Sequence, residues 1–193
     1  MTIFSQVIEN MKSRMNREVH VRFCGKAGVK FPCLTRLAAI FTDFTMTDLT
    51  IYKEEFCIST DKRKLDIDAI HEFLSTKAYW CLNIPKDKVQ TANENSLCFG
   101  IYQDNKQIGF ARIITDFSTI AYLGDVYILE EYRGRGLSKW LMETIMSYPN
   151  LQGLRRWILL TVHTHELYRK YGWTDIADPA KWMELHNKNP YSQ

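Results

Sequence analysis

Residues 122–148 combine an apolar run, a turn rich in arginine and glycine, and an amphipathic segment. Tyr122–Leu129 is apolar at most positions, which predicts a strand covered on both faces, and Gly124 is typical of a bulge. From Leu137 onward apolar residues recur at helical spacing, and Pro149 ends the pattern. We therefore predict a strand, a glycine turn and a helix.

The turn between these two elements carries Arg133, Gly134, Arg135 and Gly136. The first amides of a helix have no partner inside the helix, and they attract anions such as phosphate. Glycines lack the Cβ atoms that would hold a phosphate away from these amides, and the arginines add positive charge. The pattern suits a diphosphate site. A solvated basic turn, with glycines for tight geometry, is the alternative.

Two longer strings of the sequence point to one known family. Arg133–Ser138 resembles the [QR]xxGx[GA] motif of the GNAT acyltransferases, with Ser138 in place of the usual Gly or Ala, and the preceding DVYILEEY resembles their fourth strand. Leu167–Trp173 (LYRKYGW) resembles the LYxKxGF element that follows their fifth strand. On these two matches in the correct order, the chain is identified as a small, single-domain, bacterial-type member of the GNAT superfamily.

The remaining patterns predict an α/β (α+β) domain. Helices are expected after Asp66 and Pro85, at Leu137 and at His165. The predicted strands are Ile51–Ser59, Ser96–Gln103, Gln107–Thr115, Tyr122–Leu129, Trp157–Val162, Trp173–Ile176 and Trp182–His186. The resemblance implies the GNAT fold, which has a mixed, mostly antiparallel central sheet, helices on both faces and splayed fourth and fifth strands.

The N-terminal part of the chain does not fit this domain. Residues 1–45 show no clear period after an amphipathic start, and Met46 looks like the proper start of a domain. We interpret 1–45 as a poorly ordered extension or a mis-assigned leader, and 46–193 as the acyltransferase domain. A real helix that covers the fold is the alternative for 1–45.

Composition and charge exclude several classes of function. The 193 residues are 46% apolar, enough for one sizeable core, and a net charge of +3 gives no strong field for nucleic acid or an anionic membrane. The five cysteines are odd in number and form no CxxC pair, which is typical of reduced thiols in a cytosolic protein. We expect a cytoplasmic monomer or homodimer without a metal, a membrane span or a nucleic-acid partner.

The resemblance also implies a donor and its binding residues. Acetyl-CoA is the expected acyl donor. Backbone groups of Val126 and Ile128 would pair with its pantetheine arm. The pyrophosphate would be held by the glycine turn and the first helical residues, namely Arg133, Gly134, Arg135, Gly136, Leu137 and Ser138.

Tyr168 occupies the position of the tyrosine that serves as general acid in many members of this family. A phenol is a sufficient acid for a departing thiolate; the alternative is an aromatic residue packed beside Tyr171. Asp125 and Glu55 are candidates for the general base, and Asp125 is equally a candidate structural acceptor beside the bulge. His163 and His165 flank the expected cleft, where packing or capping roles are favoured over a base.

Tyr79 and Trp80 lie in a region that borders the acceptor site in this family, so they are candidate substrate contacts, with plain core packing as the alternative. The sequence thus predicts an N-acetyltransferase acting on a primary amine of a small molecule or a protein. A non-catalytic acyl-CoA-binding sensor or interaction module is the alternative from a different class. A nucleic-acid-binding protein would need a broader basic face.

Overall fold

A computed structural model of the chain describes residues 48–191. The prediction that residues 1–45 form an extension or a leader lies outside the described residues. Met46, where we predict the domain to begin, lies outside them as well. None of the helices within the described range is long and apolar enough to cross a membrane.

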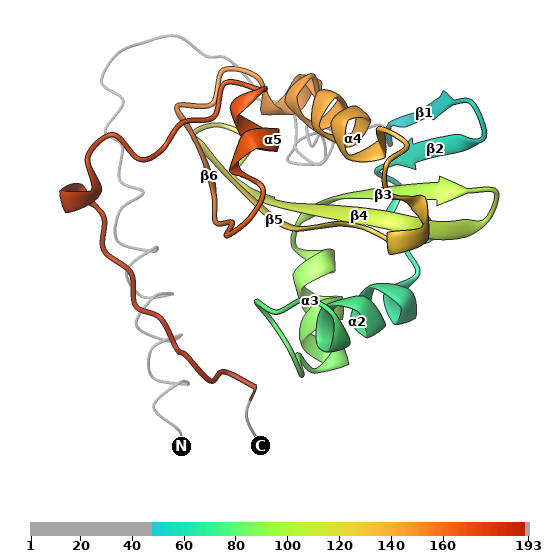
Figure 1. Ribbon diagram of the computed structural model, residues 1–193, viewed down its shortest axis with the longest axis horizontal. Helices are drawn as coiled ribbons and strands as arrows, with labels where there is room; N and C mark the ends of the chain where they lie inside the picture. Colours follow the sequence, from blue (N-terminus) through green and yellow to red (C-terminus); the bar gives the residue numbers. More distant parts are fainter. Residues whose placement is uncertain (1–47, 192–193) are drawn as a thin grey trace, which may run out of the picture. The chain divides into compact units, whose positions relative to one another are not determined.

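A six-stranded sheet forms the centre of the domain (Figure 1). Its strands follow the order β1-β2-β3-β4-β5-β6, so each strand lies beside its neighbours in the sequence. All pairs are antiparallel except β5 and β6, which are parallel because helix α4 (Leu137–Met146) connects them. The strands are β1 (Thr50–Lys53), β2 (Phe56–Ser59), β3 (Leu97–Gln103), β4 (Lys106–Thr115), β5 (Ile120–Ile128) and β6 (Arg156–Leu159).

Helices cover both faces of this sheet (Figure 1). Helices α2 (Ile67–Thr76) and α3 (Lys86–Glu94) lie on one face, whereas α4 and α5 (His165–Arg169) lie on the other. Short 3₁₀ helices span Lys62–Lys64, Glu130–Tyr132, Pro149–Leu151 and Pro179–Lys181. The mixed, mostly antiparallel sheet with helices on both faces confirms the predicted fold class.

Each face of the sheet has its own buried cluster. Phe99 of β3 packs with Leu141 of α4 in the larger cluster. Cys98, the preceding residue, packs with Ile70 of α2 in the smaller one. Successive side chains of a strand point to opposite faces, so the near-continuous apolar run of β3 supplies both cores.

The local signals for helix starts are confirmed. Asp66 caps α2, because its carboxylate accepts a hydrogen bond from the Ala69 amide at 3.0 Å. Pro85 immediately precedes α3, where a residue without an amide hydrogen leaves no donor unsatisfied. These caps fix the two helices that carry the loop with Tyr79 and Trp80 between them.

Strand β5 carries a bulge beside β4. Phe110 of β4 pairs with Tyr127, and Arg112 of β4 pairs with Gly124, so two residues of β5 oppose one residue of β4. The bulged Asp125 has a φ of 53°, in the left-handed region. The bulge therefore directly follows Gly124, the residue at which the sequence predicts a bulge.

Strands β5 and β6 are paired only over the first part of β5. Their register runs from Ile120 opposite Arg156 to Leu123 opposite Leu159, where β6 ends. Strand β5 continues past the bulge to Ile128 with no strand of residues 48–191 on this side. Strands β5 and β6 correspond to the fourth and fifth strands of the prediction. Their separation confirms the predicted splaying, and it leaves a free edge on β5.

The predicted first strand, Ile51–Ser59, is wrong in one respect. The segment forms two strands, β1 and β2, which pair with each other as a hairpin. Glu54 at the turn has a φ of 53°, a conformation that ends a strand. The charged residues at this point of the sequence therefore form the turn and do not lie within one continuous strand.

The two predicted C-terminal strands, Trp173–Ile176 and Trp182–His186, are also wrong, since neither segment is a strand in the described structure. The predicted strand Trp157–Val162 is also too long, because the observed strand β6 spans Arg156–Leu159. Alternation of apolar residues predicts a strand, but a strand needs a hydrogen-bonded neighbour. Beyond Leu159 the described residues 48–191 supply none.

Candidate active site

The turn that leads into α4 presents a row of free amides. Gly134 and Gly136 have φ angles of 79° and 77°, in the left-handed region that glycine adopts without a steric cost. Gly136 precedes the first residue of α4, and no side chain caps this helix. Within residues 48–191, no protein acceptor bonds any backbone amide from Gly134 to Lys139. Six adjacent donors at a helix N-terminus fit a diphosphate.

The space in front of these amides is open. A Cβ atom placed on Gly134 or Gly136 would meet no protein atom within 4 Å. Gly134, Arg135 and Gly136 are exposed, whereas Leu137 is buried and anchors the start of α4 in the core. The donors therefore stand on a rigid helix end and face outward.

The two arginines of the turn already have contacts with their own chain. Arg135 lies over the rings of Phe56 and Tyr132, and its guanidinium is 3.7 Å from the Glu55 carboxylate. The Arg133 side chain donates to the carbonyl of Ile128 at 3.2 Å. Glu55, a candidate general base, thus lies beside the glycine turn and forms an exposed ion pair there.

The free edge of β5 leads from the bulge to this turn. The Leu129 amide donates to the Ile108 carbonyl of β4 at 2.9 Å. Because amides alternate in direction along a strand, those of Val126 and Ile128 point away from β4, to the side where β6 has ended. These two amides are therefore available to an extended ligand on the free edge.

At the bulge, Asp125 forms a largely buried ion pair. Its carboxylate accepts a hydrogen bond from Arg112 Nε at 2.7 Å, and the two side chains are only 13% and 16% exposed. The Arg112 guanidinium also donates to the Ser96 hydroxyl at 3.3 Å. The second oxygen of Asp125 accepts a bond from the Trp80 indole at 3.2 Å. Both carboxylate oxygens of Asp125 are thus engaged.

Trp80 and Tyr79 are exposed, although large aromatic side chains are usually packed in the core of a protein. Their rings meet edge to face at 5.1 Å, and Tyr79 lies 6.2 Å from the His163 ring. These aromatic side chains come from the α2–α3 loop and from the segment after β6. They form an accessible aromatic surface beside the bulge.

Tyr168 in α5 is buried, and its ring lies 6.0 Å from that of Trp173. Burial raises the pKa of Tyr168; a hydrogen bond with Thr164 opposes this shift, and the nearby Tyr79 adds to it. The phenol therefore stays protonated at neutral pH, as a general acid requires.

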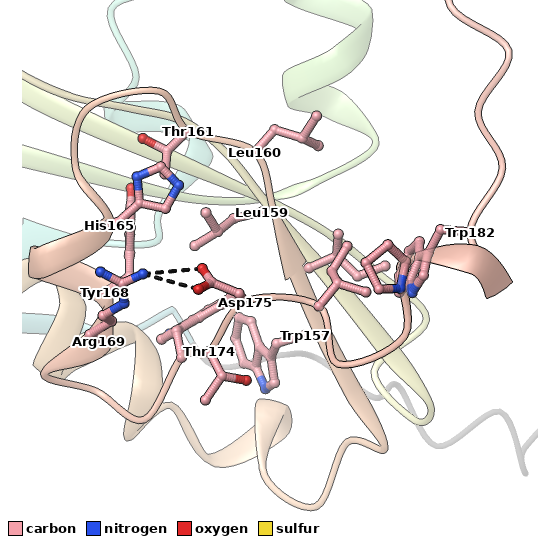
Figure 2. Close-up of a pocket in the computed structure, with 14 residues that line it drawn as sticks. Trp157, Leu159, Leu160, Thr161, His165, Tyr168, Arg169, Thr174, Asp175 and Trp182 are labelled. Atoms are coloured by element: carbon pink, nitrogen blue, oxygen red, sulfur yellow. Dashed lines mark hydrogen bonds and ion pairs between the residues drawn. The ribbon is translucent and has the colours of Figure 1, made fainter.

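A pocket of about 420 Å³ lies beside Tyr168, on the outer side of β6 (Figure 2). It is lined by β6 and by residues of the segments that follow, including His165 and Trp173. None of the residues Arg133–Ser138 lines this pocket. The structure thus brings Tyr79, Trp80 and Asp125 together at the bulge, at the other end of the free β5 edge from the glycine turn, and it places Tyr168 beside the pocket next to β6.

Comparison with known proteins agrees with this arrangement. The profile of the acetyltransferase (GNAT) family matches residues 67–173, more than half of the chain. The chain belongs to the GNAT acetyltransferase family. The match begins at α2 and ends at Trp173, so it includes the glycine turn, the β5 edge and Tyr168.

Individual relatives support the same GNAT membership. A Gibberella zeae protein named as an acetyltransferase is 33% identical over 139 residues, covering 60% of this chain and 77% of its own length. The crystal structure of a Xanthomonas campestris protein assigned to the GNAT family is 46% identical, with a TM-score of 0.71, and covers 74% of this chain and 100% of its own. An acetyltransferase structure from Deinococcus radiodurans shares the fold at 14% identity and a TM-score of 0.57, and the match covers 74% of this chain and 96% of that one.

Two residues near the acceptor end of the candidate active site, Arg112 and Tyr191, are not among the site residues predicted from the sequence. Arg112, the partner of Asp125, is one of two charged residues in β4, and no local pattern distinguishes it. Tyr191 lies near Cys81, Asp125 and Arg112, and burial raises the pKa of its phenol. Tyr191 reaches this place from the C-terminal segment, which only the folded chain reveals.

We expect Asp125→Asn to lower the free energy of unfolding by roughly 3 kcal/mol, because it leaves the Arg112 guanidinium without its counter-charge in a largely buried place. Asparagine tolerates the positive φ at this position, so the backbone is not strained. Urea unfolding of the two proteins measures the difference.

The matched control is Asp68→Asn, which removes an exposed ion pair with Lys86 and should cost less than about 1 kcal/mol. A loss of turnover in Asp125→Asn without a larger loss of stability than in the control would contradict the structural role.

Among residues 48–191 no three His, Cys, Asp or Glu side chains gather as a metal site would require.

Proposed function

We propose that this GNAT protein transfers an acetyl group from acetyl-CoA to a primary amine of a small molecule or a protein. The observation that carries the proposal is the row of free amides at the start of α4, which continues the free edge of β5. Amides at a helix N-terminus fit a pyrophosphate, and an open strand edge fits an extended arm with amide groups. Family membership supports the same donor.

In this proposal the amides from Gly134 to Ser138 bind the pyrophosphate, and those of Val126 and Ile128 pair with the pantetheine arm. Each hydrogen bond to a charged oxygen contributes roughly 1.5–3 kcal/mol. The thioester supplies the acetyl group and departs as a thiolate. Holding the thioester and the amine side by side is the main catalytic contribution of the chain, since effective molarities of oriented partners reach roughly 10⁵–10⁸ M.

Tyr168 donates its phenolic proton to the departing sulfur in this proposal. The raised pKa keeps the proton on Tyr168 until the thiolate forms. The neutral amine that attacks loses one proton when it becomes an amide, and this proton restores the phenol; the proton that an ammonium group must lose before it attacks goes to the solvent. No net proton is gained or lost by the protein over the cycle.

Of the two roles that the sequence leaves open for Asp125, its contacts support the structural one. Each oxygen of the carboxylate already accepts one bond, from Arg112 and from Trp80, and this holds the side chain in place. Asp125 then orients Trp80, which with Tyr79 forms the surface that receives the acceptor. The free thiols of Cys57, Cys81 and Cys98 support the cytosolic location that belongs to this proposal.

Turnover of acetyl-CoA with a panel of primary amines tests the proposal. We expect release of the CoA thiol, followed with a thiol reagent, together with a mass gain of one acetyl group on an acceptor. Binding of acetyl-CoA in calorimetry without turnover on any amine would favour the non-catalytic binding module. Absence of binding would contradict the proposal.

A further inference from the structure

Tyr79 and Trp80 form the tip of a tight turn between α2 and α3. The Cys81 amide donates to the Ala78 carbonyl at 3.0 Å, so the two aromatic residues take the central positions of a β-turn. Such positions usually carry glycine, proline or small polar residues. The turn itself therefore does not explain why two large aromatic side chains lie at its tip.

The residues around this tip anchor it to α2. Ala78 is buried, and the half-buried Cys81 thiol donates to the Leu74 carbonyl at 3.4 Å. The Asn83 amide donates to the Ser75 carbonyl at 2.9 Å. These bonds hold the two aromatic side chains outward in a fixed place, which lowers the entropy cost of binding a ligand to them.

About half of each of these side chains remains open to the solvent, since Tyr79 is 55% and Trp80 is 45% exposed. His163, from the segment after β6, is also exposed, and its ring lies 6.2 Å from that of Tyr79. Exposed apolar patches of this kind mark binding sites. Three rings from two distant segments thus line one open surface beside the bulge.

The rings of Tyr79 and Trp80 form a right-angled corner. Their centroids are 5.1 Å apart, and their planes meet at 89°. A third, planar ring stacked on one of them would present its edge to the face of the other. Offset stacking and edge-to-face contact are the two arrangements that aromatic rings prefer. The corner therefore has the shape to bind an aromatic ring.

The charges beside the corner balance each other. The Asp125 carboxylate, which accepts the Trp80 indole bond, is paired with the Arg112 guanidinium. In the described part of the chain, no hydrogen bond or ion pair joins Tyr79 or Trp80 to any other charged side chain. A second ammonium group on an acceptor would thus find no free carboxylate here, whereas an uncharged ring needs none.

The corner lies where the proposed donor would end. The Trp80 indole donates to Asp125 at 3.2 Å, and Asp125 immediately precedes Val126 on β5. In the acetyl-transfer proposal the pantetheine arm runs from Ile128 to Val126, so its thioester comes next, beside the bulge. Successive residues of a strand lie about 3.3 Å apart. A ring in the corner therefore needs only a short alkyl link to bring its amine to the thioester.

We propose that the acceptor is a small arylalkylamine, whose uncharged aromatic ring binds in the corner between Tyr79 and Trp80. This inference rests on the acetyl-transfer proposal and narrows its acceptor to one chemical class. The amine nitrogen forms a bond to the acetyl carbon, and the bond from that carbon to sulfur breaks. The products are the CoA thiol and an N-acetylated arylalkylamine.

Steady-state kinetics with acetyl-CoA and three amines test this acceptor class: 2-phenylethylamine, 2-cyclohexylethylamine and 1,4-diaminobutane. We expect 2-phenylethylamine to have the highest kcat/KM, by at least roughly 10-fold, because the saturated ring loses the aromatic contacts with two side chains. Tyr79→Leu should lower the preference for the phenyl over the cyclohexyl compound by roughly 5-fold, since one of these contacts is removed. Comparing this ratio between proteins cancels the difference in amine basicity.

Tyr52→Leu is the matched control, since Tyr52 is an exposed aromatic residue in β1, at the other end of the sheet order from β5 and β6. It should keep the preference. Both altered side chains are exposed, so circular dichroism should show an unchanged fold in both variants. Equal kcat/KM for the two ring compounds, a higher value for the diamine, or an unchanged preference in Tyr79→Leu would overturn the acceptor class and leave acetyl transfer in place.

Binding in the absence of turnover separates this inference from the acetyl-transfer proposal. Saturation-transfer NMR of the full chain with coenzyme A should show the ring protons of 2-phenylethylamine in contact with the protein, and Tyr79→Leu should weaken the signal. Acetylation of other amines without this ring contact would overturn the present inference alone. Ring contact without acetylation of any amine would contradict the acetyl-transfer proposal, and the assignment of the acceptor would fall with it.

Discussion

Replacing Gly136 by valine is expected to weaken coenzyme A binding by at least roughly 100-fold. Gly136 has a φ of 77°, which a β-branched residue adopts only with strain, and the new side chain enters the open space in front of the amides. Loss of two charge-assisted hydrogen bonds at roughly 1.5 kcal/mol each accounts for this factor. Isothermal titration calorimetry of both proteins with coenzyme A measures it.

Gly153→Val separates this effect from general strain. Gly153 has a φ of 73° and open space around its Cβ position, but it lies after α4, away from the turn. The two variants should therefore lose similar stability in thermal unfolding, and only Gly136→Val should lose affinity. Equal affinity of the Gly136 variant and the unaltered chain would contradict the assignment of the glycine turn.

Tyr168→Phe is expected to lower kcat by roughly 10²–10⁴-fold with little change in the affinity for coenzyme A, because it removes a general acid and leaves the ring packing in place. Burial holds the pKa of Tyr168 above its usual value. The active, protonated form therefore persists through neutral pH, and its contribution is lost as the pH rises through the raised pKa. The pH dependence of kcat in both proteins measures this.

Tyr171→Phe is the control for Tyr168→Phe, because it makes the same change three residues further along the same segment. The Tyr171 hydroxyl donates to the Lys139 carbonyl at 3.0 Å, a contact with the first turn of α4. This variant should keep kcat within a few-fold of the unaltered protein. If Tyr168→Phe kept its turnover as well, Tyr168 would be a packing residue, the alternative that the sequence leaves open.

The glycine turn was predictable from the sequence because local rules determine it. A helix that starts at Leu137 leaves its first amides without partners inside the helix wherever it lies in the fold, and glycines at 134 and 136 can take left-handed angles without a steric cost. The caps at Asp66 and Pro85 are local in the same sense. Such features need no knowledge of the rest of the chain.

The acceptor end was less predictable because it depends on contacts between distant segments. Arg112 meets Asp125 across two strands, Trp80 reaches the same carboxylate from the α2–α3 loop, and Tyr191 arrives from the C-terminal segment. The sequence names Asp125 and Trp80 as candidates but not their mutual bond. The role of Asp125 changes once its partners are known.

The wrong strand predictions share one physical cause. The apolar residues of Trp173–Ile176 and Trp182–His186 suit a buried face, but a strand also needs backbone partners. Within residues 48–191 the chain gives these segments none, and the same absence leaves the outer edge of β6 open.

The structure of the full chain bound to coenzyme A tests the central claim most directly. The account predicts pyrophosphate oxygens within hydrogen-bonding distance of the backbone amides between Gly134 and Ser138, with the pantetheine arm along the β5 edge at Val126 and Ile128. A pyrophosphate bound elsewhere, with these amides still without a partner, would contradict it.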